Sequence, residues 1–160
     1  SRIGNDAKAP LQMKKAKIEL SLEQLRLVMR ACDFTSRFIC GQVETSYWPS
    51  EAMHNKALNI NDPEWPKIRD EVDALMFQVK KLVWKMDQHA SYGVGFNPNS
   101  DAMYDIQQVI RHEIWKMNNP NGSERHSVDA YPAHKYGPHP LVEVVIEDET
   151  EEETEEPEVK

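Results

Sequence analysis

Apolar side chains recur at helical spacing in three stretches of the chain, and each stretch opens with residues that favour a helix start. Ser21 precedes the first stretch, and Gln24 is placed to complete a capping box with it. Asp62 and Pro63 precede the second, and the Asn97-Pro-Asn-Ser turn precedes the third. We therefore predict a mainly α protein, a compact bundle of three long helices with connecting loops, over residues of about 21–41, 62–89 and 101–118.

The rest of the chain divides into an arm, an extended segment and a tail. Residues 1–16 show no sustained period and are predicted to be a flexible arm, followed by a single helical domain over residues 17–146. The β-branched run at 141–146 predicts a short C-terminal extended segment or a lone strand. Residues 147–160 predict a disordered acidic tail, because nine of them are Asp or Glu and one is Lys.

The second predicted helix has the most regular apolar stripe in the chain, which is typical of an amphipathic helix with its apolar side on the protein core. Phe77 and Trp84 lie off this stripe, seven residues apart on a second face. As exposed aromatic side chains they would mark a subunit contact, or they would be covered by the arm or the tail. The stripe consists of Trp65, Ile68, Val72, Leu75, Met76, Val79, Leu82, Val83 and Met86.

Charge and cysteine content narrow the class of protein. The formal net charge of −8 lies entirely in residues 147–160, so the folded part has no overall sign that would draw it to nucleic acid or to a membrane. No apolar run is long enough to span a bilayer. Cys32 and Cys40 are too far apart on one helix, roughly 12 Å, to form a disulfide with each other. These features predict a cytoplasmic protein.

The loop before the third helix allows two interpretations. Gly93 and Gly95 permit a tight turn, and free amides at a helix start bind anions, so a phosphate-bearing ligand is one interpretation. The other is a plain corner between two helices. Asp101 and Asp105 argue against the anion, because they already complement the helix dipole and would repel it.

The usual catalytic and metal patterns are absent from the sequence. His112, His126, His134 and His139 match no zinc spacing, and no pair of nearby cysteines supports them. No nucleophile elbow or Gly-Lys-Ser/Thr phosphate loop occurs either. We therefore expect no enzymatic activity, no metal site and no cofactor.

Two segments resemble a family of small, uncharacterised helical proteins of bacteriophages and prophages. The first segment, residues 20–42, contains LSLEQL and SRFICGQ, and the second, residues 91–112, contains SYGVG and YDIQQVIRH. The resemblance covers roughly 45 residues and implies no activity by itself. It does place polar residues where helix packing alone would favour apolar ones, so the two segments are expected to converge on a shared site or a subunit interface. The expected ligand-binding residues are Arg37, Gln42, Tyr92, Gly93, Gly95, Gln108, Arg111 and His112.

What the resemblance implies about function is a non-enzymatic binding protein that counteracts a host defence in the host cytoplasm. Its partner would be a nucleotide-type small molecule or a host defence protein, and the protein would form a homo-oligomer. Two alternatives stay open. The acidic tail could act as a nucleic-acid mimic in a protein–protein inhibitor, or the chain could be a structural or packaging accessory of the virion.

Overall fold

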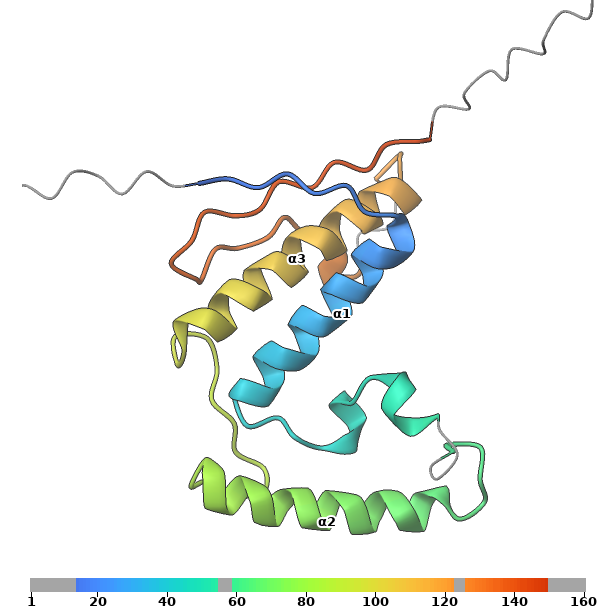
Figure 1. The fold of residues 1–160 in the computed structure, drawn as a ribbon, viewed down its shortest axis with the longest axis vertical. Coiled ribbons are helices and arrows are strands. Elements are labelled where there is room, and N and C mark those ends of the chain that lie inside the picture. Colours follow the sequence, from blue (N-terminus) through green and yellow to red (C-terminus); the bar gives the residue numbers. More distant parts are fainter. Residues whose placement is uncertain (1–13, 55–58, 123–125, 150–160) are drawn as a thin grey trace, which may run out of the picture.

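The computed structural model describes residues 14–54, 59–122 and 126–149, and all its regular structure is helical. The described residues form no strand, so the predicted mainly α architecture with three long helices is confirmed. Helices α1 and α3 pack side by side, and α2 lies across one end of that pair (Figure 1). In chain order the elements, with η for a 3-10 helix, are α1 (Leu22–Ile39), η1 (Thr45–Tyr47), η2 (Ser50–Met53), α2 (Trp65–Val83), α3 (Pro98–Asn118) and η3 (Val128–Ala130).

Helix α1 begins at the predicted capping box. The Ser21 hydroxyl accepts a hydrogen bond from the Gln24 amide at 3.1 Å, and the Gln24 side-chain oxygen accepts one from the Ser21 amide at 2.9 Å. The helix ends at Ile39, and two residues later Gly41 takes a left-handed conformation with φ of 84°. A residue without a Cβ adopts that conformation without strain, so Gly41 turns the chain away from the helix axis.

The apolar core is small, and it lies on α3 and in the segment that follows α1. Among the described residues, the buried apolar side chains are Cys40, Val43, Ile110 and Ile114. Polar side chains are buried as well, mostly on α3, and a buried polar group needs a partner to offset its lost hydration. The fold therefore depends on specific hydrogen bonds as well as on apolar packing. The buried polar residues are Ser36, Thr45, Lys80, Ser100, Asp101, Asp105, Gln107 and Gln108.

Helix α2 begins three residues later than the sequence predicted. The Asp62 carboxylate accepts a hydrogen bond from the Glu64 amide at 2.9 Å, and the Asp62 carbonyl accepts one from the Trp65 amide at 2.9 Å. These bonds close a turn ahead of the helix, whose first residue is Trp65. Asp62 therefore shapes the entry to α2 but is not its N-cap.

The side of α2 that meets the rest of the protein carries Lys80 and Trp84, one helical turn apart. The Lys80 ammonium group donates to the Gln88 carbonyl at 2.9 Å and lies 3.7 Å from a Glu44 carboxylate oxygen. Trp84 packs edge-to-face on Phe38 with ring centroids 5.3 Å apart. Lys80 is only 1% exposed, so this side is the buried one.

The predicted apolar stripe of α2 is only partly covered. Five of its nine members are half-buried, and four are exposed: Leu75, Val79, Leu82 and Val83. Leu75 is 67% exposed and Leu82 is 70% exposed. The expectation that the stripe faces the core is therefore wrong for its exposed members. Phe77 and Trp84, for which both an exposed and a covered position were open, are partly buried. The physical reason is that periodicity shows which side of a helix is apolar but not which side is covered.

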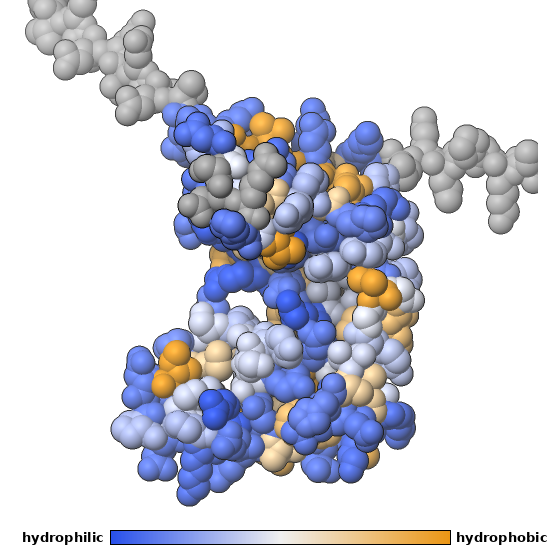
Figure 2. Space-filling model, turned by 180° about the vertical axis from the view of Figure 1, so that it is seen from behind, coloured by the Kyte–Doolittle hydropathy of each residue, from blue (hydrophilic) through white to orange (hydrophobic). Residues whose placement is uncertain are grey.

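The C-terminal part of the chain is extended and runs back along α3 without forming a strand (Figure 1). The predicted extended segment at 141–146 is therefore present. Of the predicted arm and tail, residues 1–13 and 150–160 lie outside the described residues. Seen from behind, the surface is notched between the part built on α1 and α3 and the part below it (Figure 2). None of the described helices combines the length and the hydropathy needed to cross a lipid bilayer.

Candidate functional site

A pocket lies between the last turns of α1, the loop before α3 and the first turns of α3. Its volume is about 240 Å³. Four of the eight predicted site residues line it together: Arg37, Gln42, Tyr92 and Gly93. Two segments that are fifty residues apart in the chain thus meet at this pocket, whereas Gln108, Arg111 and His112, also expected at a shared site, do not line it. The other lining residues are Asp33, Ser36, Cys40, Val94, Ser100, Asp101 and Tyr104.

Arg37 is held at the edge of the pocket by three neighbours. Its Nε lies 3.0 Å from the Asp33 carboxylate, one turn earlier on α1, and its Nη1 donates to the Gln42 side-chain oxygen at 2.8 Å. The guanidinium also lies 5.1 Å from the centre of the Tyr47 ring, a cation–π distance. The Gln42 backbone N–H donates to the Arg37 carbonyl at 2.9 Å. Among the described residues, Arg37 Nη2 and the side-chain nitrogen Nε2 of Gln42 have no hydrogen-bond partner. These groups are donors that a bound molecule can use.

The aromatic side chain of Tyr92 lines the pocket and stacks on Phe96, which lies outside it. Tyr92 and Phe96 stack with ring centroids 3.7 Å apart and planes 4° apart, and both side chains are exposed. The Tyr92 amide donates to the Cys40 carbonyl at 2.9 Å, which ties the loop to the end of α1. The loop therefore presents a flat aromatic pair to solvent next to Arg37.

The floor of the pocket is a short chain of hydrogen bonds between α1 and α3. The Ser100 hydroxyl donates to the Ser36 carbonyl at 2.9 Å, and Cys40 Sγ lies 3.3 Å from the same hydroxyl. All three side chains are buried. This floor fixes the distance between the two helices, and its polar groups already have partners.

The amides at the start of α3 are occupied by the protein itself. The Asn97 side-chain oxygen accepts from the amides of Asn99 and Ser100 at 2.9 and 3.1 Å. The Gly95 amide, where φ is 90°, donates to both carboxylate oxygens of Asp101 at 3.0 and 3.1 Å. A carboxylate thus already takes the position where a phosphate would bind, so this geometry is that of a corner between helices.

Gln108, Arg111 and His112 meet the C-terminal segment. The Gln108 side chain donates to the His134 carbonyl at 3.0 Å and accepts from the His134 amide at 3.2 Å. His112 Nδ1 lies 2.9 Å from the Asp129 carbonyl oxygen, and Arg111 Nε lies 3.2 Å from an Asp129 carboxylate oxygen. The Arg111 contact is an ion pair without hydrogen-bond alignment. These three predicted site residues therefore hold the fold together, and they do not line the Arg37 pocket.

A second and larger hollow, of about 500 Å³, adjoins the first. Asp33 and Arg37 line both hollows, so their ion pair forms the wall between them. Tyr47 and Trp48 also line this second hollow, and sequence reasoning missed their role. They follow Gly41 closely, but nothing in their spacing predicts that the chain folds back on α1. The remaining lining residues are Met29, Arg30, Phe34, Ser46, Pro49, Ser50 and Gln107.

The charges around Arg37 are mixed. The first pocket contains one guanidinium and two carboxylates, from Asp33 and Asp101. A site without excess positive charge has little attraction for a phosphate-bearing ligand. Over the residues that the structure describes, no three His, Cys, Asp or Glu side chains come together in a way that would hold a metal ion.

Comparison with protein-family models, with curated proteins and with solved structures found no match to this chain. The resemblance to phage proteins therefore stays a prediction from the sequence. The interpretation of the site rests on the residues themselves and on their geometry.

Proposed function

We propose that this chain is a non-enzymatic binding protein whose paired hollows around Arg37 dock on another protein. The observation that carries the proposal is that Arg37 lines both hollows. Exposed Tyr92 also lines the first hollow, and exposed Tyr47 and half-exposed Trp48 line the second. Arg, Tyr and Trp are the side chains that most often dominate the binding energy of protein interfaces. Their concentration around one point fits the centre of such an interface.

The donors of the site and the size of its first pocket favour a protein over a nucleotide. The first pocket, of about 240 Å³, is smaller than the range of roughly 300–1,000 Å³ that is usual for small-molecule sites, whereas the second hollow, of about 500 Å³, lies within that range. The first pocket fits one side chain of a partner, with Arg37 Nη2 and Gln42 Nε2 as donors. The amides that would bind a phosphate at the start of α3 are already bonded to Asn97 and Asp101.

The resemblance to phage proteins supports a host protein as the partner, and we propose a defence protein in the host cytoplasm. Bacteriophages often encode small helical proteins that inhibit host defence proteins by binding them. Docking at an Arg37-centred surface would be the means by which this chain does so.

The experiment compares wild-type protein with Arg37→Ala, and with Arg26→Ala as the matched control. Arg26 is also a partly exposed arginine of α1 in an ion pair, with Glu23 at 3.8 Å, but it lies outside both hollows. Tagged protein is expressed in bacterial cells and recovered with any captured partner. The partner is then purified, and the Kd of its complex with each variant is measured. We expect Arg37→Ala to weaken binding about 30-fold, as loss of a central hot spot does, and Arg26→Ala to leave it unchanged.

Three outcomes would overturn this proposal. The first is equal affinity of wild type and Arg37→Ala for the purified partner. The second is loss of binding when residues 147–160 are deleted, which would favour the acidic tail. The third is a rise in Tm with a cyclic or phosphorylated nucleotide that Arg37→Ala abolishes, which would favour the small-molecule alternative. Arg37→Lys, which keeps the charge without the planar fork, should recover only part of the affinity.

A further inference from the structure

The outward side of α2 carries an apolar seam with a regular spacing. Its members occur at alternating steps of four and three residues along the helix: Ile68, Val72, Leu75, Val79 and Leu82. Steps that alternate in this way keep side chains in line along one side of a helix that pairs with another helix. We use the name "α2 seam" for these five residues.

Leu75, Val79 and Leu82 of the α2 seam are exposed and its other two members are half-buried, because the rest of the protein occupies the opposite side of the helix. The Asp73 carboxylate accepts a hydrogen bond from the Thr45 amide at 2.8 Å, and Trp84 Nε1 donates to the Ile39 carbonyl at 2.9 Å. Together with buried Lys80, these contacts fix which way α2 faces. Leu75 and Leu82 are consequently among the most exposed apolar side chains of the described chain.

The residue types in the α2 seam specify what kind of partner fits it. In heptad terms the β-branched Val72 and Val79 occupy a positions, and the d positions hold Ile68, Leu75 and Leu82. In parallel coiled coils, valine at a with leucine at d favours two strands over three or four. We propose that α2 pairs in parallel with α2 of a second copy of this chain, as a two-stranded coiled coil.

Charges beside the α2 seam agree with a parallel pair. In the same register Trp65, the first residue of α2, is at an a position, Glu64 falls at the g position before it, and Arg69 falls at the following e position. In a parallel coiled coil, g of one strand lies next to the following e of the other. Two symmetric Glu64–Arg69 pairs would therefore flank the start of the interface. Arg69 is free to make them, because its present ion pair, with Asp70 at 3.3 Å, is on the surface.

The length of α2 is compatible with pairing along its side. Its nineteen residues form a helix of about 28 Å. An isolated helix of this length would be marginal in water, but α2 is held in helical form by its contacts with the rest of the protein. A second copy therefore meets a seam that is already ordered, which lowers the entropy lost on pairing.

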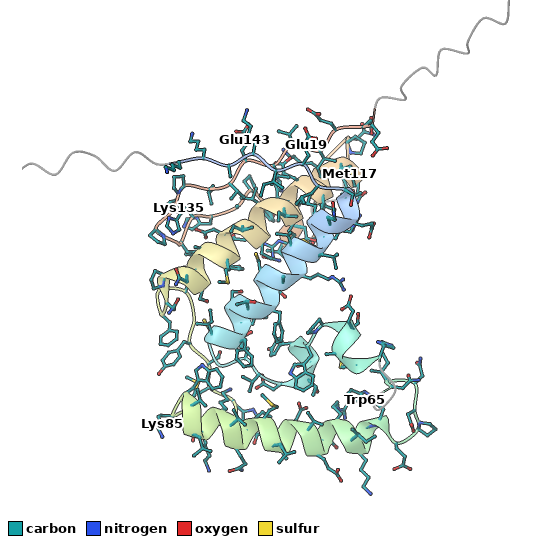
Figure 3. All side chains as sticks on the ribbon, in the orientation of Figure 1. Glu19, Trp65, Lys85, Met117, Lys135 and Glu143 are labelled. Carbon is teal, nitrogen blue, oxygen red and sulfur yellow. The ribbon has the colours of Figure 1, made fainter. Side chains whose placement is uncertain are left out.

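The ends of the same chain are poor alternatives for covering the seam. Residues 150–160 contain one large apolar side chain, Val159, among six acids. The large apolar residues of 1–13 are Ile3, Leu11 and Met13, which lack the seam's spacing. In addition, Glu19 and Glu143 lie at the end of the molecule away from α2, whose own ends are marked by Trp65 and Lys85 (Figure 3).

The test is the mass of the full chain in solution, measured by sedimentation velocity and by native mass spectrometry at micromolar concentration. We expect wild type at twice the protomer mass of 18.5 kDa, and the Leu75→Lys/Leu82→Lys variant at the protomer mass. Both leucines are exposed in the single chain, so the variant should keep its far-UV circular dichroism. Val145→Lys is the matched control, because Val145 is 68% exposed but lies outside α2, and it should stay dimeric.

A charge exchange tests the parallel arrangement. Arg69→Glu should weaken the dimer about two- to tenfold, because it places two acids side by side, and Glu64→Arg/Arg69→Glu should restore wild-type affinity. In an antiparallel pair these positions lie far apart, so neither change would act through the other. A monomeric wild type, a dimeric double-lysine variant, a trimer or tetramer, or a charge exchange without recovery would each overturn the proposal.

The α2 seam and the Arg37 hollows are separate surfaces. The dimer does not depend on the proposed function, and Arg37→Ala should leave the mass in solution unchanged.

Discussion

The buried carboxylate of Asp105 holds the backbone of Gly137, thirty-two residues further along the chain, at 2.7 Å. The same carboxylate accepts two contacts from the Tyr136 amide at 2.9 and 3.1 Å. One turn later on α3, Gln108 pairs with the backbone of His134. Two polar side chains of α3 thus take the place of a neighbouring strand for the extended C-terminal segment, which explains how that segment is fixed without a sheet.

The first prediction concerns Asp105→Asn. The substitution keeps the shape of the side chain but removes its charge and turns an N–H group toward backbone donors. Hydrogen bonds to a charged group contribute about 1.5–3 kcal/mol each, so we expect the free energy of unfolding in urea to fall by about 2 kcal/mol or more. Asp148→Asn, at an exposed position, should stay within about 0.5 kcal/mol of wild type. Equal stability of the two variants would show that the carboxylate does not anchor the segment.

The second prediction concerns Gly137→Ala. A Cβ atom at Gly137 would lie 2.7 Å from the Cα and the amide nitrogen of Ala102, and helix backbone cannot give way as a flexible side chain can. We expect a loss of about 1–3 kcal/mol, measured as a lower Tm and a lower urea midpoint. Gly93→Ala is the control, because a Cβ there has no heavy atom within 4 Å. If the two variants unfold alike, the close approach of the segment to α3 is not present in solution.

The third prediction concerns Trp84, which attaches the end of α2 to the end of α1. Trp84→Ala removes the hydrogen bond to Ile39 and the ring contact with Phe38. We expect hydrogen exchange to become faster across α2 while α3 keeps its protection. Leu27→Ala, on the exposed side of α1, should change neither helix. Uniformly faster exchange in both helices would mean that Trp84 stabilises the whole domain and not the attachment of α2.

The fourth prediction concerns the thiol of Cys32. Partial burial raises the pKa of Cys32 above its ordinary value, because the thiolate loses hydration. The reactive thiolate is then scarcer in the folded protein, so at about pH 8.5 maleimide should label Cys32 more slowly than in urea-unfolded chain. Linkage has the same sign: the folded state keeps its proton longer, so stability falls as the pH rises through that range. Labelling followed by peptide mass spectrometry checks the rate at Cys32 separately from Cys40.

Half of the candidate site could be anticipated from the sequence. Arg37 and Gln42 are close in the chain, and the glycine turn between them brings their side chains together at 2.8 Å. Polar residues on α3 were equally visible, but their partners were not. Gln108 bonds to His134, and nothing local in either segment indicates that pairing. The spacing of polar residues predicted which side chains would make hydrogen bonds. Only the fold shows whether their partner is a ligand or another part of the chain.

By itself, the sequence determined the three helices and the start of the first. Capping and apolar period act between residues within a turn or two of each other, as the Ser21–Gln24 box shows. Only the tertiary structure decided which side of α2 is covered. The contacts that set it join Glu44 to Lys80 and Ile39 to Trp84, which are tens of residues apart. Helix periodicity shows which side of a helix is apolar. Whether that side is buried depends on contacts between distant segments, so the exposure of the α2 seam is seen only in the folded chain.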